Sequence, residues 1–131
     1  MERKQDKKKA ELMRKFNEAR GGTLPLGMQK MLELNPEFFE RYLEFSTAPW
    51  KKGPLPPKVK ELILMAVDAS VPHLFEPGLR AHMRRALELG ATKEELLEVF
   101  ELISLIAIHG STLGISVLSE EYQKWEHEQE K

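Results

Sequence analysis

The sequence predicts an all-α protein of about six to eight helices. Apolar residues recur at helical spacing along most of the chain, and alternation of apolar and polar residues never lasts beyond a few positions. Turn-forming Pro, Gly and Asn residues separate the helical runs. The chain has 131 residues, the usual length of one domain. We therefore expect a single domain over residues 1–131.

Residues 1–34 are predicted to form an N-terminal helical extension. Leu12, Met13 and Phe16 give its first run an apolar stripe opposite a solvated basic face. This run is too mixed in charge, and too poor in aromatic residues, to favour nucleic-acid binding.

A second short helix is expected at residues 26–34. Gly21-Gly22 and Pro25 mark the end of the first helix before it. Asn35 then provides an N-cap for the next helix, with a proline in its first turn.

That third helix is expected to run from Pro36 to about Phe45. Four prolines and one glycine fall within residues 46–57. Because proline lacks an N–H and restricts the residue before it, this stretch is predicted to be a loop without a helix.

Pro57 is predicted to open the fourth helix, and the fifth is expected between Pro77 and Gly90. Thr92 and Glu95 form a capping box at the start of the next helix. This helix is apolar almost all round over residues 96–108 and is therefore expected to be the centre of the fold.

A break is predicted at Gly110, followed by one last helix. Its polar end, residues 122–131, is expected to fray.

Composition narrows the possible chemistry. The 20 basic and 21 acidic residues nearly balance, so neither nucleic acid nor an anionic membrane is expected as the main partner. The absence of cysteine excludes disulfides, cysteine zinc sites, iron–sulfur clusters and thiol nucleophiles. The candidate chemistry therefore falls to histidine, carboxylate and arginine side chains.

Neither a secretory signal nor a membrane span is predicted. The chain is charged from its second residue and lacks an apolar core there. Residues 100–118 approach transmembrane length, but four hydroxyl residues and two glycines interrupt them, and no Lys or Arg closely flanks them. We expect a soluble, cytoplasmic protein.

His82 and Glu61 are the first two candidate catalytic residues. His82 lies on the apolar stripe of its helix, where an imidazole can serve as a general acid or base. The alternative is a core histidine satisfied by a carbonyl or a carboxylate. Glu61, in the first turn of its helix, would orient an imidazole or hold a proton itself. Its alternative is a solvated carboxylate that stabilises the helix start.

His109 is the third candidate. It precedes a glycine and the hydroxyl residue Ser111, at the predicted helix break, although the helix dipole alone also favours a histidine at a helix end. Arg80 and Arg84 lie four residues apart near His82, so they share a helix face and are candidates for binding a substrate carboxylate. Solvated ion pairs are the alternative for both arginines.

His73 lies in a predicted loop after a proline and is kept as a candidate substrate contact. Together with Glu61, His82 and His109 it would offer a set of metal ligands. None of these residues shows the i, i+4 pairing of a helical metal motif, so no metal site is expected.

Three distinctive stretches follow one another along the chain: PKVKELI at 57–63, GLRAH at 78–82 and ALELGAT at 86–92. Glu94-Glu95 comes shortly after them. With this pattern, residues 35–121 resemble the carboxymuconolactone decarboxylase family, which includes the alkyl hydroperoxidase D proteins and shares their fold. The resemblance implies an all-α domain that assembles into trimers or hexamers, with active sites near subunit contacts.

The resemblance also separates two activities within the family. Peroxidase members carry a CxxC pair that would fall at Phe75 and Gly78, neither of which is cysteine here. Thiol peroxidase activity is therefore not expected. Gamma-carboxymuconolactone decarboxylases also lack this pair but keep the histidine that matches His82.

The resemblance implies a cofactor-independent decarboxylase or related lyase that acts on a small carboxylated lactone or enolisable acid. The lactone carbonyl would accept electrons as carbon dioxide leaves, and the protein would hold the carboxylate, stabilise the oxyanion and protonate carbon. We expect His82 to donate the proton and Glu61 to orient it. His109 or Ser111 would face the oxyanion, and Arg80 or Arg84 the carboxylate.

The alternative function is that of a non-catalytic oligomeric member which serves as a binding or scaffold protein. An enzyme should gather Glu61, His82 and His109 around one closed cavity at a subunit junction. A scaffold should instead leave His82 satisfied in the core, without space for a ligand beside it.

Overall fold

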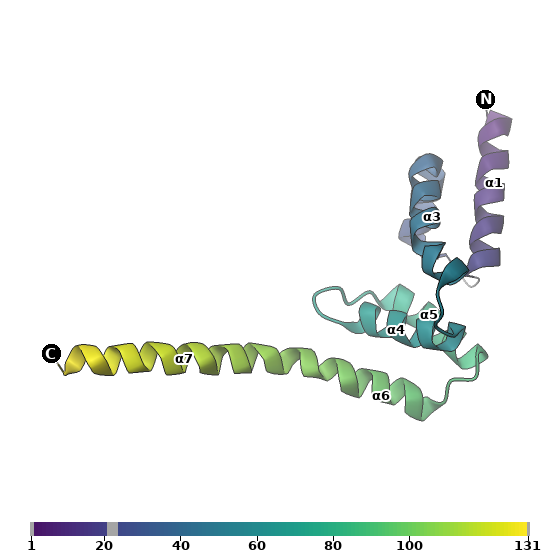
Figure 1. The fold of residues 1–131 in the computed structure, drawn as a ribbon. Coiled ribbons are helices and arrows are strands. Elements are labelled where there is room, and N and C mark those ends of the chain that lie inside the picture. Colours follow the sequence, from purple (N-terminus) through teal and green to yellow (C-terminus); the bar gives the residue numbers. More distant parts are fainter. Residues whose placement is uncertain (1, 21–23, 131) are drawn as a thin grey trace.

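The computed structural model describes residues 2–20 and 24–130 of the chain (Figure 1). The described residues form seven α-helices and one 3₁₀ helix and contain no strand, which confirms the predicted all-α class. In chain order the elements are α1 (Glu2–Ala19), α2 (Leu26–Leu34), α3 (Pro36–Lys52), α4 (Pro57–Ala69), α5 (Glu76–Glu88), α6 (Lys93–Ile103), η1 (Ser104–Ala107) and α7 (Ile108–Gln129). The Gly21-Gly22 stop signal lies outside the described residues.

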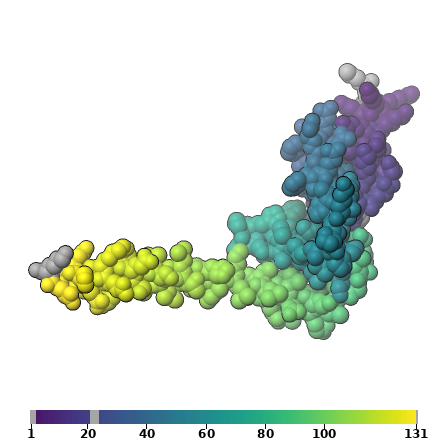
Figure 2. Space-filling model, viewed as in Figure 1, coloured from purple at the N-terminus to yellow at the C-terminus, as the bar shows by residue number. Residues whose placement is uncertain are grey.

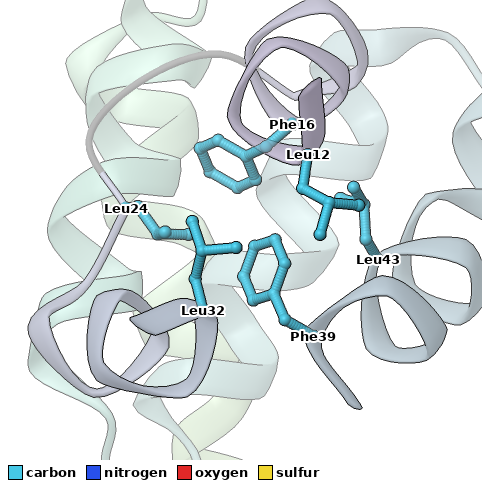
Figure 3. Packing of buried hydrophobic residues seen from close by; sticks show 6 residues of the cluster. All are labelled: Leu12, Phe16, Leu24, Leu32, Phe39 and Leu43. Carbon is cyan, nitrogen blue, oxygen red and sulfur yellow. The ribbon is translucent and has the colours of Figure 1, made fainter. Parts of the chain in front are cut away.

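Helices α1, α2 and α3 pack around the first of two hydrophobic cores (Figure 3). Its buried residues are Leu12, Phe16, Leu24, Leu32, Phe39 and Leu43. The predicted caps explain how the chain turns here, because Oδ1 of Asn35 accepts a hydrogen bond from the Phe38 N–H at 3.0 Å. Helix α2 has the predicted bounds.

Helix α3 corrects the prediction of a loop from residue 46, because it continues through Pro49 to Lys52. A proline removes only its own N–H, and the next turn still closes, with Gly53 N donating to Pro49 O at 3.1 Å. The Nζ of Lys60 also donates to Pro49 O at 2.7 Å. A side chain from α4 thus helps satisfy the carbonyls at the end of α3.

Helices α4 and α5 pack against each other, and α6 packs against α4. They enclose the second core, which contains the buried residues Met65, Ala86, Ala91 and Leu96. The predicted capping box is present: Glu95 N donates to Thr92 Oγ1 at 3.1 Å, and Thr92 N donates to the Glu95 carboxylate at 2.9 Å.

The stretch 96–108 is not the centre of the fold in the single chain, contrary to prediction. Only Leu96 is buried there. A helix that is apolar all round needs neighbours on several sides, and α4 covers only its first turns. Beyond α6, residues 104–129 extend from the body as a C-terminal arm (Figures 1 and 2).

The arm has no break at Gly110, where one was predicted. Helix α7 begins at Ile108 and passes through both Gly110 and Gly114, because a single glycine costs a helix only about 1 kcal/mol. The departure from α-helical geometry lies earlier, in η1.

The continuous helical stretch Lys93–Gln129 is long and apolar enough, by length and composition, to cross a membrane. Its most apolar window is not covered by other parts of the described chain. The same character suits a helix that is covered by a second protein.

Candidate active site

A cavity of about 910 Å³ opens between the two cores, and helices α1 to α5 and their connections contribute to its lining. Apolar and aromatic side chains make up most of the wall, among them Phe16, Tyr42, Trp50, Ile63 and Phe75. A smaller polar group comprises Arg20, Lys60, Asp68, His73, His82 and Arg85. A mostly apolar pocket with a few convergent polar groups is typical of a small-molecule site.

Glu61 and His82 are in direct contact beside this cavity. The Nδ1 of His82 lies 2.6 Å from Oε2 of Glu61. The Glu61 side chain is 2% exposed and that of His82 is 13% exposed. An ionised carboxylate only accepts, so this contact places the hydrogen on Nδ1 and orients Nε2 as the free ring nitrogen.

The helical hairpin of α4 and α5 creates this contact. Glu61 lies one turn into α4, on the side that faces α5, and His82 is near the middle of α5. Burial of a carboxylate is costly unless it is paired, and the imidazole of His82 provides that partner. Glu61 is therefore not the solvated helix-start residue of the alternative interpretation.

Two groups of opposite charge approach Nε2 of His82. The Nη2 of Arg20, which directly follows α1, lies 3.4 Å away. The Oδ2 of Asp68, on α4, lies 3.8 Å away. Oδ1 of the same carboxylate is 3.0 Å from Nε2 of His73, whose side chain is half exposed.

Arg85 brings a second guanidinium to the cavity lining. Its Nε lies 3.8 Å from Oε1 of Glu61, and it is buried without a hydrogen-bond partner among the described residues. A buried donor left without a partner costs about 1–3 kcal/mol. An oxygen atom of a bound ligand would relieve that cost.

Several predicted residues lie away from the cavity. Arg80 is exposed and forms an ion pair with Glu76, with Nη2 and Oε1 2.6 Å apart, while Arg84 is exposed to solvent. His109 and Ser111 lie on the C-terminal arm and are exposed. Of the seven predicted site residues, the described chain therefore brings together Glu61, His82 and His73. The other four lie elsewhere.

The sequence reasoning missed Arg20, Asp68 and Arg85. Two of them had a usable signal: Asp68 follows Glu61 by seven residues and Arg85 follows His82 by three, spacings that place each pair on one helix face. Arg20 had none, because it follows α1, 62 residues before His82 in the sequence, and meets that histidine only in the folded chain.

Within the part of the chain that the structure describes, no three His, Asp or Glu side chains are placed to hold a metal ion.

Comparisons with known proteins give the chain a context. A sequence model of the carboxymuconolactone decarboxylase family matches residues 36–108. Among solved structures, the chain is similar to a "putative gamma-carboxymuconolactone decarboxylase subunit" from Burkholderia xenovorans LB400, with 44% identity and a TM-score of 0.84. The match covers 89% of this chain and 47% of that chain, so this chain spans about half the length of that relative. No curated protein matches.

Proposed function

The chain belongs to the carboxymuconolactone decarboxylase family, and on that premise we propose that it is a cofactor-independent decarboxylase of a small carboxylated lactone or similar enolisable acid. The single observation that carries the proposal is the 2.6 Å contact between Glu61 and His82 at the wall of the cavity. An imidazole with Nδ1 fixed by a buried carboxylate presents Nε2 in one orientation, as a general acid or base requires.

In this mechanism the bond between the ring carbon and the carboxylate breaks, and its electron pair moves towards the lactone carbonyl as carbon dioxide leaves. His82 then delivers a proton from Nε2 to carbon. Glu61 holds the ring in place and stabilises the imidazolium form. The apolar wall excludes water around the reacting atoms, which strengthens these interactions.

The arginines that line the cavity are better placed to bind the carboxylate of the substrate than the arginines predicted from the sequence. Arg20 and Arg85 are at the cavity, whereas Arg80 and Arg84 are outside it in the described chain. Guanidinium groups bind carboxylates with paired, charge-assisted hydrogen bonds. His73 contributes at the same wall through its contact with Asp68.

We also propose that the chain acts as a homo-oligomer, a trimer or hexamer, in the cytoplasm. Large apolar side chains on α7 are about half or more exposed, namely Leu113, Ile115, Val117, Leu118, Tyr122 and Trp125. A run of exposed large apolar and aromatic side chains is typical of a protein interface. The similar Burkholderia protein is itself named a subunit. Assembly would allow His109 and Ser111 of one copy to approach the cavity of another.

The direct test is carbon dioxide release from gamma-carboxymuconolactone by the purified protein. We expect turnover by the native chain and a fall in kcat of about 10²–10⁴ in His82→Gln, the usual contribution of a general acid. His127→Gln is the matched control, because this histidine is exposed on α7. Release of carbon dioxide at the native rate by His82→Gln would remove the mechanism.

Lack of turnover with gamma-carboxymuconolactone and with related carboxylated lactones would overturn the proposal. Binding without turnover would favour a non-catalytic binding protein that kept the family fold.

A further inference from the structure

The two neighbours of Nε2 in His82 require opposite protonation states. A guanidinium only donates hydrogen bonds, so the contact with Arg20 requires Nε2 without a proton. A carboxylate only accepts, so Asp68 at 3.8 Å favours a protonated Nε2. The neighbour that prevails determines whether His82 is a neutral imidazole or an imidazolium.

We propose that a carboxylate ligand in the cavity switches His82 into its protonated form by drawing Arg20 away from Nε2, which leaves Asp68 as the charged neighbour. This inference rests on the proposed function, since it describes how a carboxylated substrate prepares its own proton donor. Asp68 acts through His82 and is therefore a positioning residue, whereas Arg20 would contact both the ligand and His82.

Arg20 is held weakly enough to move. Its two side-chain hydrogen bonds, to His82 Nε2 and to the hydroxyl of Tyr42, are both 3.4 Å long and end on neutral acceptors. A carboxylate would offer shorter, charge-assisted bonds, which are roughly twice as strong as neutral ones. A ligand carboxylate therefore outcompetes both present partners.

Asp68 is held firmly by comparison. His73 lies 3.0 Å from its Oδ1, and the carboxylate packs directly against Gly78, where any Cβ would collide with it. Its side chain is 10% exposed. When Arg20 leaves, Asp68 is already in place to stabilise a proton on Nε2.

The remaining charged groups around His82 are not exchanged when a ligand binds. Glu61, on α4, contacts Nδ1 and accepts its hydrogen in both states, so its stabilisation of the imidazolium is present with and without a ligand. Arg85, on α5, faces the Glu61 carboxylate, with its Nε 3.8 Å from Oε1. His73 reaches the imidazole through Asp68. The protonation state of His82 therefore depends on whether Arg20 or Asp68 is the closer charged neighbour of Nε2.

The proton balance closes over one catalytic cycle. On ligand binding, Nε2 takes one proton from solvent. After carbon dioxide leaves with breakage of its C–C bond, this proton moves to carbon, and His82 returns to the neutral form. Nε2 is then again an acceptor for Arg20. Decarboxylation consumes one proton per turnover, which this cycle supplies.

The test is NMR of ¹⁵N-labelled protein at about pH 6.5, the ordinary midpoint of histidine, with 2-furoate as the probe. The ring ¹⁵N shifts report the imidazolium-to-imidazole ratio of each histidine without any turnover. We expect saturation with 2-furoate to raise this ratio for His82 about tenfold, because a nearby cation is removed. The neutral 2-furamide should leave the ratio unchanged, and His127 is the internal reference.

Arg20→Gln should raise the His82 ratio without ligand, and 2-furoate should add little to it. Asp68→Asn should lower the ratio and weaken the response. Circular dichroism checks that both variants are folded. If Asp68→Asn does not fold, Arg20→Gln still tests the proposal, because Arg20 is partly exposed and its replacement disturbs the packing less.

An unchanged His82 ratio with 2-furoate bound, a full response in Arg20→Gln, or failure of 2-furoate to bind would each overturn the switch. The test remains distinct from that of the proposed function. A protein that shows the switch but releases no carbon dioxide overturns the decarboxylase proposal alone, and turnover without the switch overturns only this inference.

Discussion

The carboxylate of Asp68 packs against Gly78, in space that a Cβ at position 78 would occupy. Gly78 is buried on α5, and a Cβ there would collide with the carboxylate of Asp68 and with the ring of Phe75. By family resemblance, position 78 is where peroxidase members keep the second cysteine of their active pair. This chain has no thiol at position 78, and the Asp68 carboxylate beside it lies 3.8 Å from Nε2 of His82.

Gly78→Ala should destabilise the protein by about 1–3 kcal/mol, the usual cost of overpacking a buried site. The displaced carboxylate should also lose its contact with His73, visible as a changed ¹⁵N shift of that ring. Urea unfolding measures the first effect. Gly27→Ala is the control, because a Cβ there meets nothing within 4 Å. Equal stability of the two variants would show that Asp68 does not occupy this space.

Glu61→Ala should destabilise the fold more than Glu61→Gln. Alanine leaves the Nδ1 hydrogen of His82 buried without an acceptor, at a cost of about 1–3 kcal/mol, whereas the glutamine carbonyl can still accept it. Denaturant unfolding of both variants gives the comparison. Similar losses for both would indicate that the charge of Glu61, rather than its acceptor role, stabilises the hairpin of α4 and α5.

Acid should weaken the start of α6 through Glu95. Its hydrogen bond from the Thr92 N–H, followed by that from Lys58, holds the pKa of this carboxyl below its ordinary value of 4.5. A group with a lowered folded pKa contributes stability above its unfolded pKa, and this contribution is lost as pH falls through the folded pKa. Glu95→Gln should therefore have a lower Tm than the native chain at neutral pH.

The Tm difference between Glu95→Gln and the native chain should narrow as the pH falls below about 4.5, since the native carboxyl then becomes protonated too. Thermal scans of both proteins across this range check the prediction. A Tm difference that stays constant with pH would assign the effect to packing instead of charge.

Leu113→Glu should lower the oligomeric mass measured by light scattering. Leu113 lies on the exposed apolar surface of α7, and a charge buried in a subunit contact without a partner is strongly unfavourable. Lys124→Gln, on the same helix, should leave the mass unchanged. A native chain that is monomeric without detergent would contradict the proposed assembly. Recovery of the protein only from membranes would show that the arm contacts lipid instead of another subunit.

Local signals allowed much of the fold to be predicted from sequence. The Asn35 cap and the capping box of Thr92 and Glu95 act within one turn of chain, so the residues involved are neighbours in the sequence. The helix through Pro49 was missed because its end is supported by Lys60, which comes from another element.

For the site, the sequence by itself determined the types of group available and the helices that carry them: no thiol, an imidazole on the apolar stripe of the helix that is α5, and a carboxylate in the first turn of the helix that is α4. Only tertiary structure decided that Arg20 and Asp68 both approach Nε2 of His82, and that Arg80, Arg84, His109 and Ser111 do not. The physical reason is that periodicity fixes which face a side chain occupies, whereas its partners depend on how separate helices pack.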